Sequence, residues 1–254
     1  MNRELDVIYT KFKLGLLENR EYKINLIMVL LFDVSILLAS FVLLIILEQI
    51  SGITSWGVLE FSMFLAFALL NGKINFAITF RDFKQILLSG NFNNYVNKPI
   101  SPFIFLITER FNGANLLSGI VIVLPITIIL SIFFEFTLLG WLLFIIGVVH
   151  CTLLFWFIEI IAFFLKDNSF VAVPIKRATW FFEEYVPLFL QNTSFFKFIG
   201  VIPSVIFAFL AVDVMRGNFE YVFLLIASVI SIPILVLVCI MMWERGIKKY
   251  EAYG

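Results

Sequence analysis

The sequence predicts an all-α, polytopic membrane protein with six transmembrane helices. Of its 254 residues, 62% are hydrophobic and 14% are charged, whereas soluble domains are roughly half apolar and about a quarter charged. This number of charged side chains is too small to form the water-facing surface of a soluble protein. The chain also contains several apolar runs of the roughly 20 residues that a helix needs to cross a bilayer. We therefore expect a single transmembrane domain, residues 1–254, with lipid as its main solvent.

The apolar runs define the expected spans. The second run is interrupted by Asn71-Gly72-Lys73, where it could end. The fifth is short and contains Pro203, which suggests a kinked, tilted or partly re-entrant segment. Six spans fit the runs best, with five or seven as the alternatives. Their approximate positions are 24–47, 56–78, 114–134, 138–165, 198–215 and 219–243.

The distribution of Lys and Arg predicts the orientation. Seventeen of the 18 basic residues lie in the N-terminal segment, in the loops after the second and fourth spans, or at the C-terminus. The three opposite loops are very short and share only Arg216. Because basic residues collect on the cytoplasmic side, we expect both termini in the cytoplasm and the chain in the plasma membrane. The polar first 23 residues do not resemble a cleavable signal peptide, so the first span should remain as an anchor.

Three segments on the basic side are amphipathic. Residues 4–16 place apolar side chains on one helical face and charged ones on the other, which predicts an interfacial helix. Residues 76–88 and 175–191 have a similar pattern. Both of these segments could rest among the lipid headgroups. The segment 76–88 could instead be a docking surface for a soluble partner. The expected apolar stripe of residues 76–88 consists of Phe76, Phe80, Phe83 and Leu87.

Ionisable side chains within the apolar runs are candidates for function, because a charge inside a membrane is costly. Asp33 lies ten residues into the first span, about 15 Å deep at ~1.5 Å per residue. These side chains could form a proton or cation path, or a polar substrate site. The pattern favours an interhelical pair instead, such as Arg110 with Glu159 or with Asp33. The intramembrane polar candidates are Asp33, Glu109, Arg110 and Glu159, with Glu60 in the outer half of the second span.

The chain contains no recognisable catalytic motif. His150 is the single histidine, and Cys151 and Cys239 lie in apolar runs far from any CxxC spacing. His-based metal clusters and Ser-His-Asp catalysis therefore lack their components, and no GxxxxGK[ST] phosphate loop occurs. We expect no catalytic residue, metal or cofactor, and no nucleic-acid partner. If the protein uses ATP, another chain must bind it.

Three stretches resemble signatures of one family. Residues 89–102, SGNFNNYVNKPISP, are similar to the G-x-hydrophobic-(D/N)-x-x-L-x-x-P-(L/I)-(S/N)-P pattern of the ABC-2 type permeases, the small six-helix membrane subunits of ABC transporters. Residues 243–254, WERGIKKYEAYG, resemble that family's W-x-x-G-(L/I)-(R/K)-(R/K)-Y-x-x-x-G ending. Residues 185–187 and 202–203 resemble a third passage, whereas residues 211–213 replace the family's aromatic-Pro pair. The resemblance extends over essentially the whole chain.

The resemblance implies a non-enzymatic permease subunit. Such a chain works as a dimer, with an identical or paralogous permease, together with two copies of a separate ATP-binding cassette ATPase. In that fold the first cytoplasmic loop is a coupling helix, here residues 76–88, which presses into a groove of the ATPase. The short outer loops favour an exporter, and the apolar spans favour a hydrophobic or amphipathic substrate. The residues expected at the ATPase contact are Arg81, Asp82, Gln85, Asn91, Asn93, Lys98 and Pro99.

The residues leave two other functions open. A stand-alone secondary carrier or channel would use Asp33 and Glu159 and would transport without ATP. A membrane-embedded assembly or lipid-modifying factor is the second alternative, and the sequence contains no catalytic residue for it.

Overall fold

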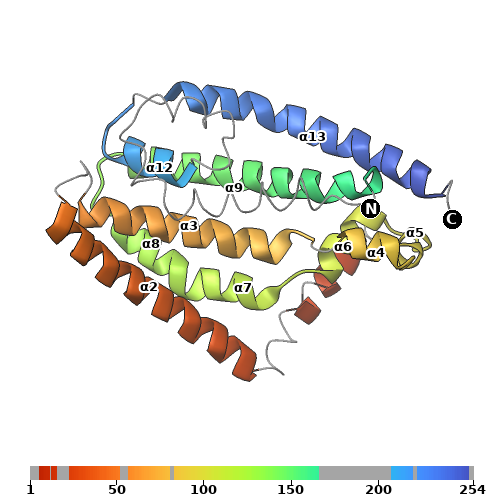
Figure 1. Cartoon of the computed structure of the whole chain (residues 1–254), viewed down its shortest axis with the longest axis horizontal. Helices are drawn as coiled ribbons and strands as arrows, with labels where there is room; N and C mark the ends of the chain where they lie inside the picture. Colours follow the sequence, from red (N-terminus) through yellow and green to blue (C-terminus); the bar gives the residue numbers. More distant parts are fainter. Residues whose placement is uncertain are drawn as a thin grey trace.

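The computed structural model describes residues 6–11, 13–15, 23–51, 57–80, 83–165, 207–219 and 222–251, and their regular structure is entirely helical (Figure 1). The expected all-α fold class is confirmed. The four longest helices are α2 (Lys23–Ser51), α3 (Val58–Ile78), α9 (Thr137–Ile160) and α13 (Val222–Glu251). The shorter ones are α4 (Phe83–Leu88), α5 (Asn93–Val96), α6 (Pro102–Glu109), α7 (Gly113–Ser118), η1 (Gly119–Val123), α8 (Leu124–Ser131), η2 (Ile161–Phe163) and α12 (Phe207–Met215).

Within the described chain, four helical segments are long and apolar enough to cross a membrane. Helix α2 contains a further, shorter apolar stretch, Ile27–Ile36, inside the expected first span. The total of six spans stays a prediction. The four segments are Val58–Leu88, Gly113–Ser131, Thr137–Phe163 and Val229–Tyr250.

The ends of the expected spans agree with the helices to different degrees. Helix α13 continues eight residues beyond the predicted end at residue 243 and includes most of the tail motif. Helix α12 covers the last part of the expected span 198–215, and the rest of that span lies outside the described residues. The amphipathic segment 175–191 also lies outside them. Residues 6–11 and 13–15 are helical, within the segment expected at 4–16.

The third expected span is not a uniform α-helix. Helix α7 passes into the π-helical turn η1, which is followed by α8 with Pro125 in its first turn. Proline has no N–H group to donate to the preceding turn, and local π-helical adjustments can satisfy the backbone groups that a proline frees in a membrane helix. The expected boundaries, 114–134, nevertheless agree closely with the combined segment Gly113–Ser131.

The single helix expected at residues 76–88 is wrong. Helix α3 ends at Ile78, Thr79 is extended with φ −87° and ψ 131°, and α4 begins at Phe83. The backbone N–H of Asn112 donates to the carbonyl of Ala77 at 3.1 Å, so a later segment takes up an acceptor at the helix end. The predicted stripe is divided as a result.

Phe76 lies on the other side of this division from the rest of the stripe. Its side chain is 49% exposed, whereas Phe80 and Phe83 are buried and Leu87 is partly buried. The predicted stripe therefore combines an exposed apolar residue at the end of α3 with the buried apolar face of α4.

Helix α3 lies at the centre of the bundle. It packs against α2, α7, α8, α9 and α12, and α13 runs along α9 on the opposite side (Figure 1). Small residues allow α9 and α12 to approach closely. A Cβ atom added at Gly140 would lie 2.9 Å from the carbonyl oxygen of Ala211, and one added at Gly147 would overlap Phe207. Close approach of a neighbouring helix at glycine is typical of helix pairs in membranes.

The two ends of the bundle differ in chemistry. We call the end that contains α4, α5, α6 and the last turns of α13 the loop end (Figure 1). At the other end, Arg216 follows α12 and pairs with Glu60 in the first turn of α3, with 3.4 Å between Nε and Oε1. Arg216 is the one basic residue predicted in the outer loops, and here it is partly neutralised.

Candidate functional site

The two family-like motifs meet at the loop end. Phe92, from the 89–102 stretch, packs edge-to-face on Trp243 and Tyr250 of the tail, with ring centroids 6.0 and 5.0 Å apart. Trp243 also contacts Phe83 of α4 and Phe163 of η2, at 5.6 and 5.4 Å. These rings, together with Phe80, Tyr95 and Phe103, form an aromatic cluster in which Tyr250 and Phe103 are partly buried and the others are buried. Residues far apart in the sequence therefore form one rigid support.

A hydrogen bond also ties α4 to a spanning helix. The backbone N–H of Phe83, in the first turn of α4, donates to Oε2 of Glu159 in α9 at 3.3 Å. Glu159 is 5% exposed, and Phe83 is fully buried. The N-terminal N–H groups of a helix lack partners within it, and a carboxylate there is also favoured by the helix dipole. Glu159 thus acts here as an anchor for α4.

Five of the predicted ATPase-contact residues lie on the exposed side of this support. They belong to α4, to α5 and to the turns around it, and Gly90 has a positive φ of 72° at one of these turns. Arg81 and Asp82 lie outside the described residues. The exposed residues are Gln85, Asn91, Asn93, Lys98 and Pro99.

A polar pocket opens between α4, α5 and α6. Its volume is about 340 Å³, which is within the range of roughly 300–1,000 Å³ typical of small-molecule sites. Ile86 and the ring of Phe105 provide apolar walls. The polar lining consists of Asn91, Asn94, Tyr95, Lys98, Glu109 and Arg110.

Glu109 and Arg110 belong to this pocket and are exposed at the end of α6. Tyr95 forms a side-chain hydrogen bond with Glu109. Burial, followed by the hydrogen bond and the charge of Glu109, raises the pKa of Tyr95 from 10.0 to about 12, against a smaller opposing effect of Arg110. Glu109 and Arg110 are therefore groups of the loop end, in contrast to the intramembrane role considered for them.

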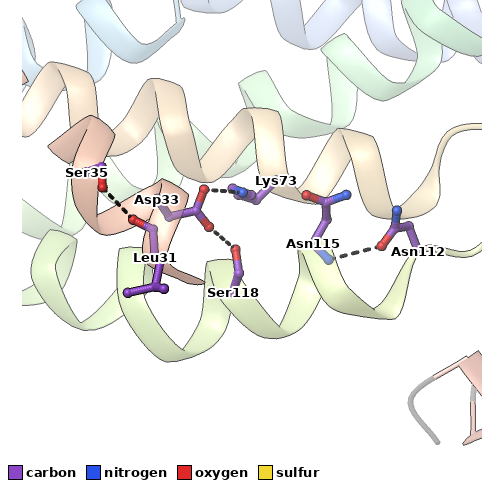
Figure 2. Close-up of polar contacts among 7 residues, drawn as sticks. All are labelled: Leu31, Asp33, Ser35, Lys73, Asn112, Asn115 and Ser118. Atoms are coloured by element: carbon purple, nitrogen blue, oxygen red, sulfur yellow. Dashed lines mark hydrogen bonds and ion pairs between the residues drawn. The ribbon is translucent and has the colours of Figure 1, made fainter. Parts of the chain in front are cut away.

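A second polar site lies within the helix bundle. The carboxylate of Asp33 in α2 is 2.5 Å from Nζ of Lys73 in α3. Its second oxygen accepts a hydrogen bond from the hydroxyl of Ser118 in α7 (Figure 2). Asp33 is buried, and the side chain of Lys73 is 14% exposed. Three helices are thus joined by one ion pair and one hydrogen bond.

The expected interhelical pair exists, but the partner is different. The sequence predicts Arg110 as the partner of Asp33 or Glu159, whereas Asp33 pairs with Lys73. The sequence also predicts a loop position for Lys73, because Asn71-Gly72-Lys73 interrupts the apolar run. In the structure α3 continues through this tripeptide to Ile78. The signal available in the sequence was that Lys73 lies within the expected span 56–78, where a cation requires an opposite charge such as Asp33 in the span 24–47.

Polar side chains continue along the contact between α3 and α9. Nδ2 of Asn75 donates to Oδ1 of Asn71 at 2.7 Å, and the hydroxyl of Thr152 donates to Oδ1 of Asn75 at 2.8 Å. Asn71, Asn75 and Thr152 are all buried. The side-chain oxygens of Asn71 and Asn75 each accept a hydrogen bond, which avoids the free-energy cost of an unpaired polar group in the membrane. The tripeptide that looked like an interruption is thus part of an interhelical polar contact.

The helical bundle and its exposed polar end define a multi-pass membrane protein. A family model described as "ABC-2 family transporter protein" matches residues 34–254, so the chain belongs to this family. It is accordingly a membrane permease subunit of an ABC transporter, a type of chain that associates with an ABC ATPase subunit. Comparison with curated proteins and with solved structures finds no match.

Proposed function

We propose that this permease is an ATP-driven exporter of a hydrophobic or amphipathic substrate, and that its loop end is the docking surface for the ATPase. The observation that carries the proposal is the combination of exposed polar residues with a rigid support beneath them. Gln85, Asn93 and Lys98 are exposed, while Phe83 and Phe92 of the same segment are fully buried. A surface of this kind can bind a polar partner and transmit force.

The support connects the docking surface to two spanning segments. Glu159 links the start of α4 to α9, and Trp243 links α4 and the following turn to α13. A displacement of α4 by the ATPase would therefore move α9 and α13 together. Because packed side chains transmit strain, closure of the ATPase subunits would change how these helices pack in the membrane.

The proposed assembly contains two permease chains and two ATPase subunits in the plasma membrane, with both termini cytoplasmic. The distribution of basic residues supports this orientation, because the described ones gather mainly at the loop end and at the N-terminal helix. Lys73 is not one of these loop residues, because it lies within α3 and pairs with Asp33 inside the bundle. The short loops at the opposite end support export, because they offer little surface for a capture protein.

Charge reversal at Lys98 tests the docking surface. Lys98→Glu should lower co-purification with the ATPase and lower substrate-stimulated ATP hydrolysis in proteoliposomes. Lys13→Glu is the matched control, because Lys13 is an exposed lysine of the N-terminal helix. Unchanged ATPase binding and stimulated hydrolysis for Lys98→Glu would contradict the proposed contact.

The geometry gives less support to a stand-alone carrier. Such a carrier would use Asp33 and Glu159, but Asp33 is neutralised by Lys73 and Glu159 holds α4. Substrate uptake into liposomes that contain the permease alone, without ATP and abolished by Asp33→Asn, would favour the carrier instead.

A further inference from the structure

The polar pocket at the loop end has an excess of positive charge. Lys98 and Arg110 line it, and Glu109 is the one acidic side chain in its lining. Tyr95 is hydrogen-bonded to the Glu109 carboxylate. Asn91 and Asn94 add amide groups that can donate hydrogen bonds. The lining therefore offers several donors and a net positive charge to an anion.

A third cation approaches the pocket from the N-terminal helix. Nζ of Lys11 lies 5.3 Å from the ring centroid of Phe105, and Nζ of Lys98 lies 5.9 Å from the same centroid. Cations at this distance from an aromatic ring are attracted to its face. The ammonium groups of Lys11 and Lys98 therefore both lie near Phe105, which forms one wall of the pocket. The N-terminal helix is fixed here by a second contact, because Gly15 packs against Phe111.

The same helix places apolar side chains next to these charges. Tyr9 is 69% exposed and Leu14 is 47% exposed, although both are large apolar residues. Lys11 and Lys13 belong to the same short helix. Exposed apolar residues interleaved with lysines are typical of a helix in the membrane interface, where binding is strengthened by anionic lipids. The pocket therefore adjoins the region in which lipid phosphates lie.

We propose that this pocket binds the phosphate group of an anionic phospholipid, with Arg110 and Lys98 as its charged contacts and Lys11 beside them. Arginine can form two parallel hydrogen bonds to phosphate oxygens, and lysine acts as a point charge. Basic pockets beside membrane helices are established positions for anionic headgroups. Asn91 and Lys98 belong both to this pocket and to the proposed ATPase contact, so the test below uses Arg110 and Glu109, which belong to the pocket alone.

Lipid retention by the purified full-length permease tests the site. The protein is reconstituted in nanodiscs that contain equal amounts of phosphatidylglycerol and phosphatidylcholine, and the lipids retained after extraction are counted by native mass spectrometry. We expect preferential retention of phosphatidylglycerol. Arg110→Gln should lower this preference by about fivefold, the effect of one cation near a membrane surface. Glu109→Gln should raise it, because the substitution removes the competing negative charge.

Two controls make the result specific. Lys248→Gln removes an exposed lysine from α13 outside the pocket lining and should leave the preference unchanged. A large excess of free glycerol phosphate distinguishes the source of the phosphate. Undisturbed phosphatidylglycerol retention supports a lipid site, whereas displacement by free glycerol phosphate overturns the lipid assignment in favour of a soluble phosphate. Equal retention of both lipids, or equal losses from Arg110→Gln and Lys248→Gln, would overturn the pocket itself.

Discussion

Asp33 in α2 and Lys73 in α3 form an ion pair within the helix bundle, with 2.5 Å between the carboxylate and the ammonium group. Among the α2 side chains that the structure describes, Asp33 is the buried one, while neighbours such as Leu31 and Phe32 are more than half exposed. Among the described side chains of α2, the exposed ones are therefore mostly apolar, Val29, Leu30 and Ile36 are partly buried, and the buried one forms an ion pair. Ser118 completes this contact from α7.

The ion pair predicts strongly non-additive effects of substitution. Asp33→Asn leaves the Lys73 ammonium without its counter-charge, and loss of one partner of a buried pair costs about 3–5 kcal/mol. Combining it with Lys73→Met removes both charges and should cost less than Asp33→Asn alone. A double-mutant cycle of the free energy of unfolding in detergent measures this difference. Additive losses would mean that the two side chains do not interact.

The aromatic cluster predicts that Trp243 holds α4 and α5 in place. Trp243→Ala removes a ring that is 8% exposed and contacts Phe83 and Phe92. Such a truncation costs about 3–5 kcal/mol, whereas Trp243→Phe retains most of the packing. Hydrogen exchange should accelerate at the amides of residues 83–98 in the Ala variant, with residues 124–131 of α8 as an internal control. Equal acceleration in both regions would indicate general unfolding instead.

Hydropathy predicted the principal helices because a bilayer imposes a length on them. The expected spans 24–47, 56–78 and 138–165 agree with α2, α3 and α9 within a few residues at most boundaries. The break at Thr79 was missed because Phe80 and Phe83 continue the hydrophobic pattern across it. Their burial depends on Trp243 and Phe163, which are distant in the sequence.

The sequence identified candidate polar residues of the site, but it did not identify the residues with which they pair. Asp33 stood out because a carboxylate deep in an apolar run requires compensation. Its partner Lys73 was hidden by Asn71 and Gly72, which look like the end of a helix. Asn71 is compatible with a buried helix because its Nδ2 donates to Sγ of Cys151 in α9 and its Oδ1 accepts from Asn75. Glu109 and Arg110 were associated with the membrane because they adjoin the start of the third expected span, 114–134.

Tyr95 predicts a loss of stability at high pH. Its pKa is raised to about 12, first by burial and then by Glu109, so the folded protein favours the neutral phenol. This contribution to stability is fully present below pH 10.0, the ordinary pKa, and disappears as pH rises toward about 12. Phenolate absorbance, compared between the natural protein and Tyr95→Phe, measures the titration. Glu109→Gln should lower the midpoint, and an unchanged midpoint would exclude the influence of Glu109.

Two glycines in spanning helices predict opposite responses to alanine. A Cβ atom at Gly147 in α9 would overlap Cβ and Cγ of Phe207, so α12 must shift. Overpacking of this kind costs about 1–3 kcal/mol. Gly72 in α3 has no described atom within 4 Å of the position of an added Cβ. Gly72→Ala should therefore stabilise α3 by about 0.5–1 kcal/mol, the conformational cost of glycine in a helix.

Thermal unfolding in detergent compares the two variants directly. Gly147→Ala should lower the midpoint and Gly72→Ala should raise it, although the chemical change is the same. Because both glycines lie inside helices, a general effect of alanine on helix propensity would shift both midpoints upward. A raised midpoint for Gly147→Ala would therefore show that α12 does not pack on α9 at this position in the membrane protein.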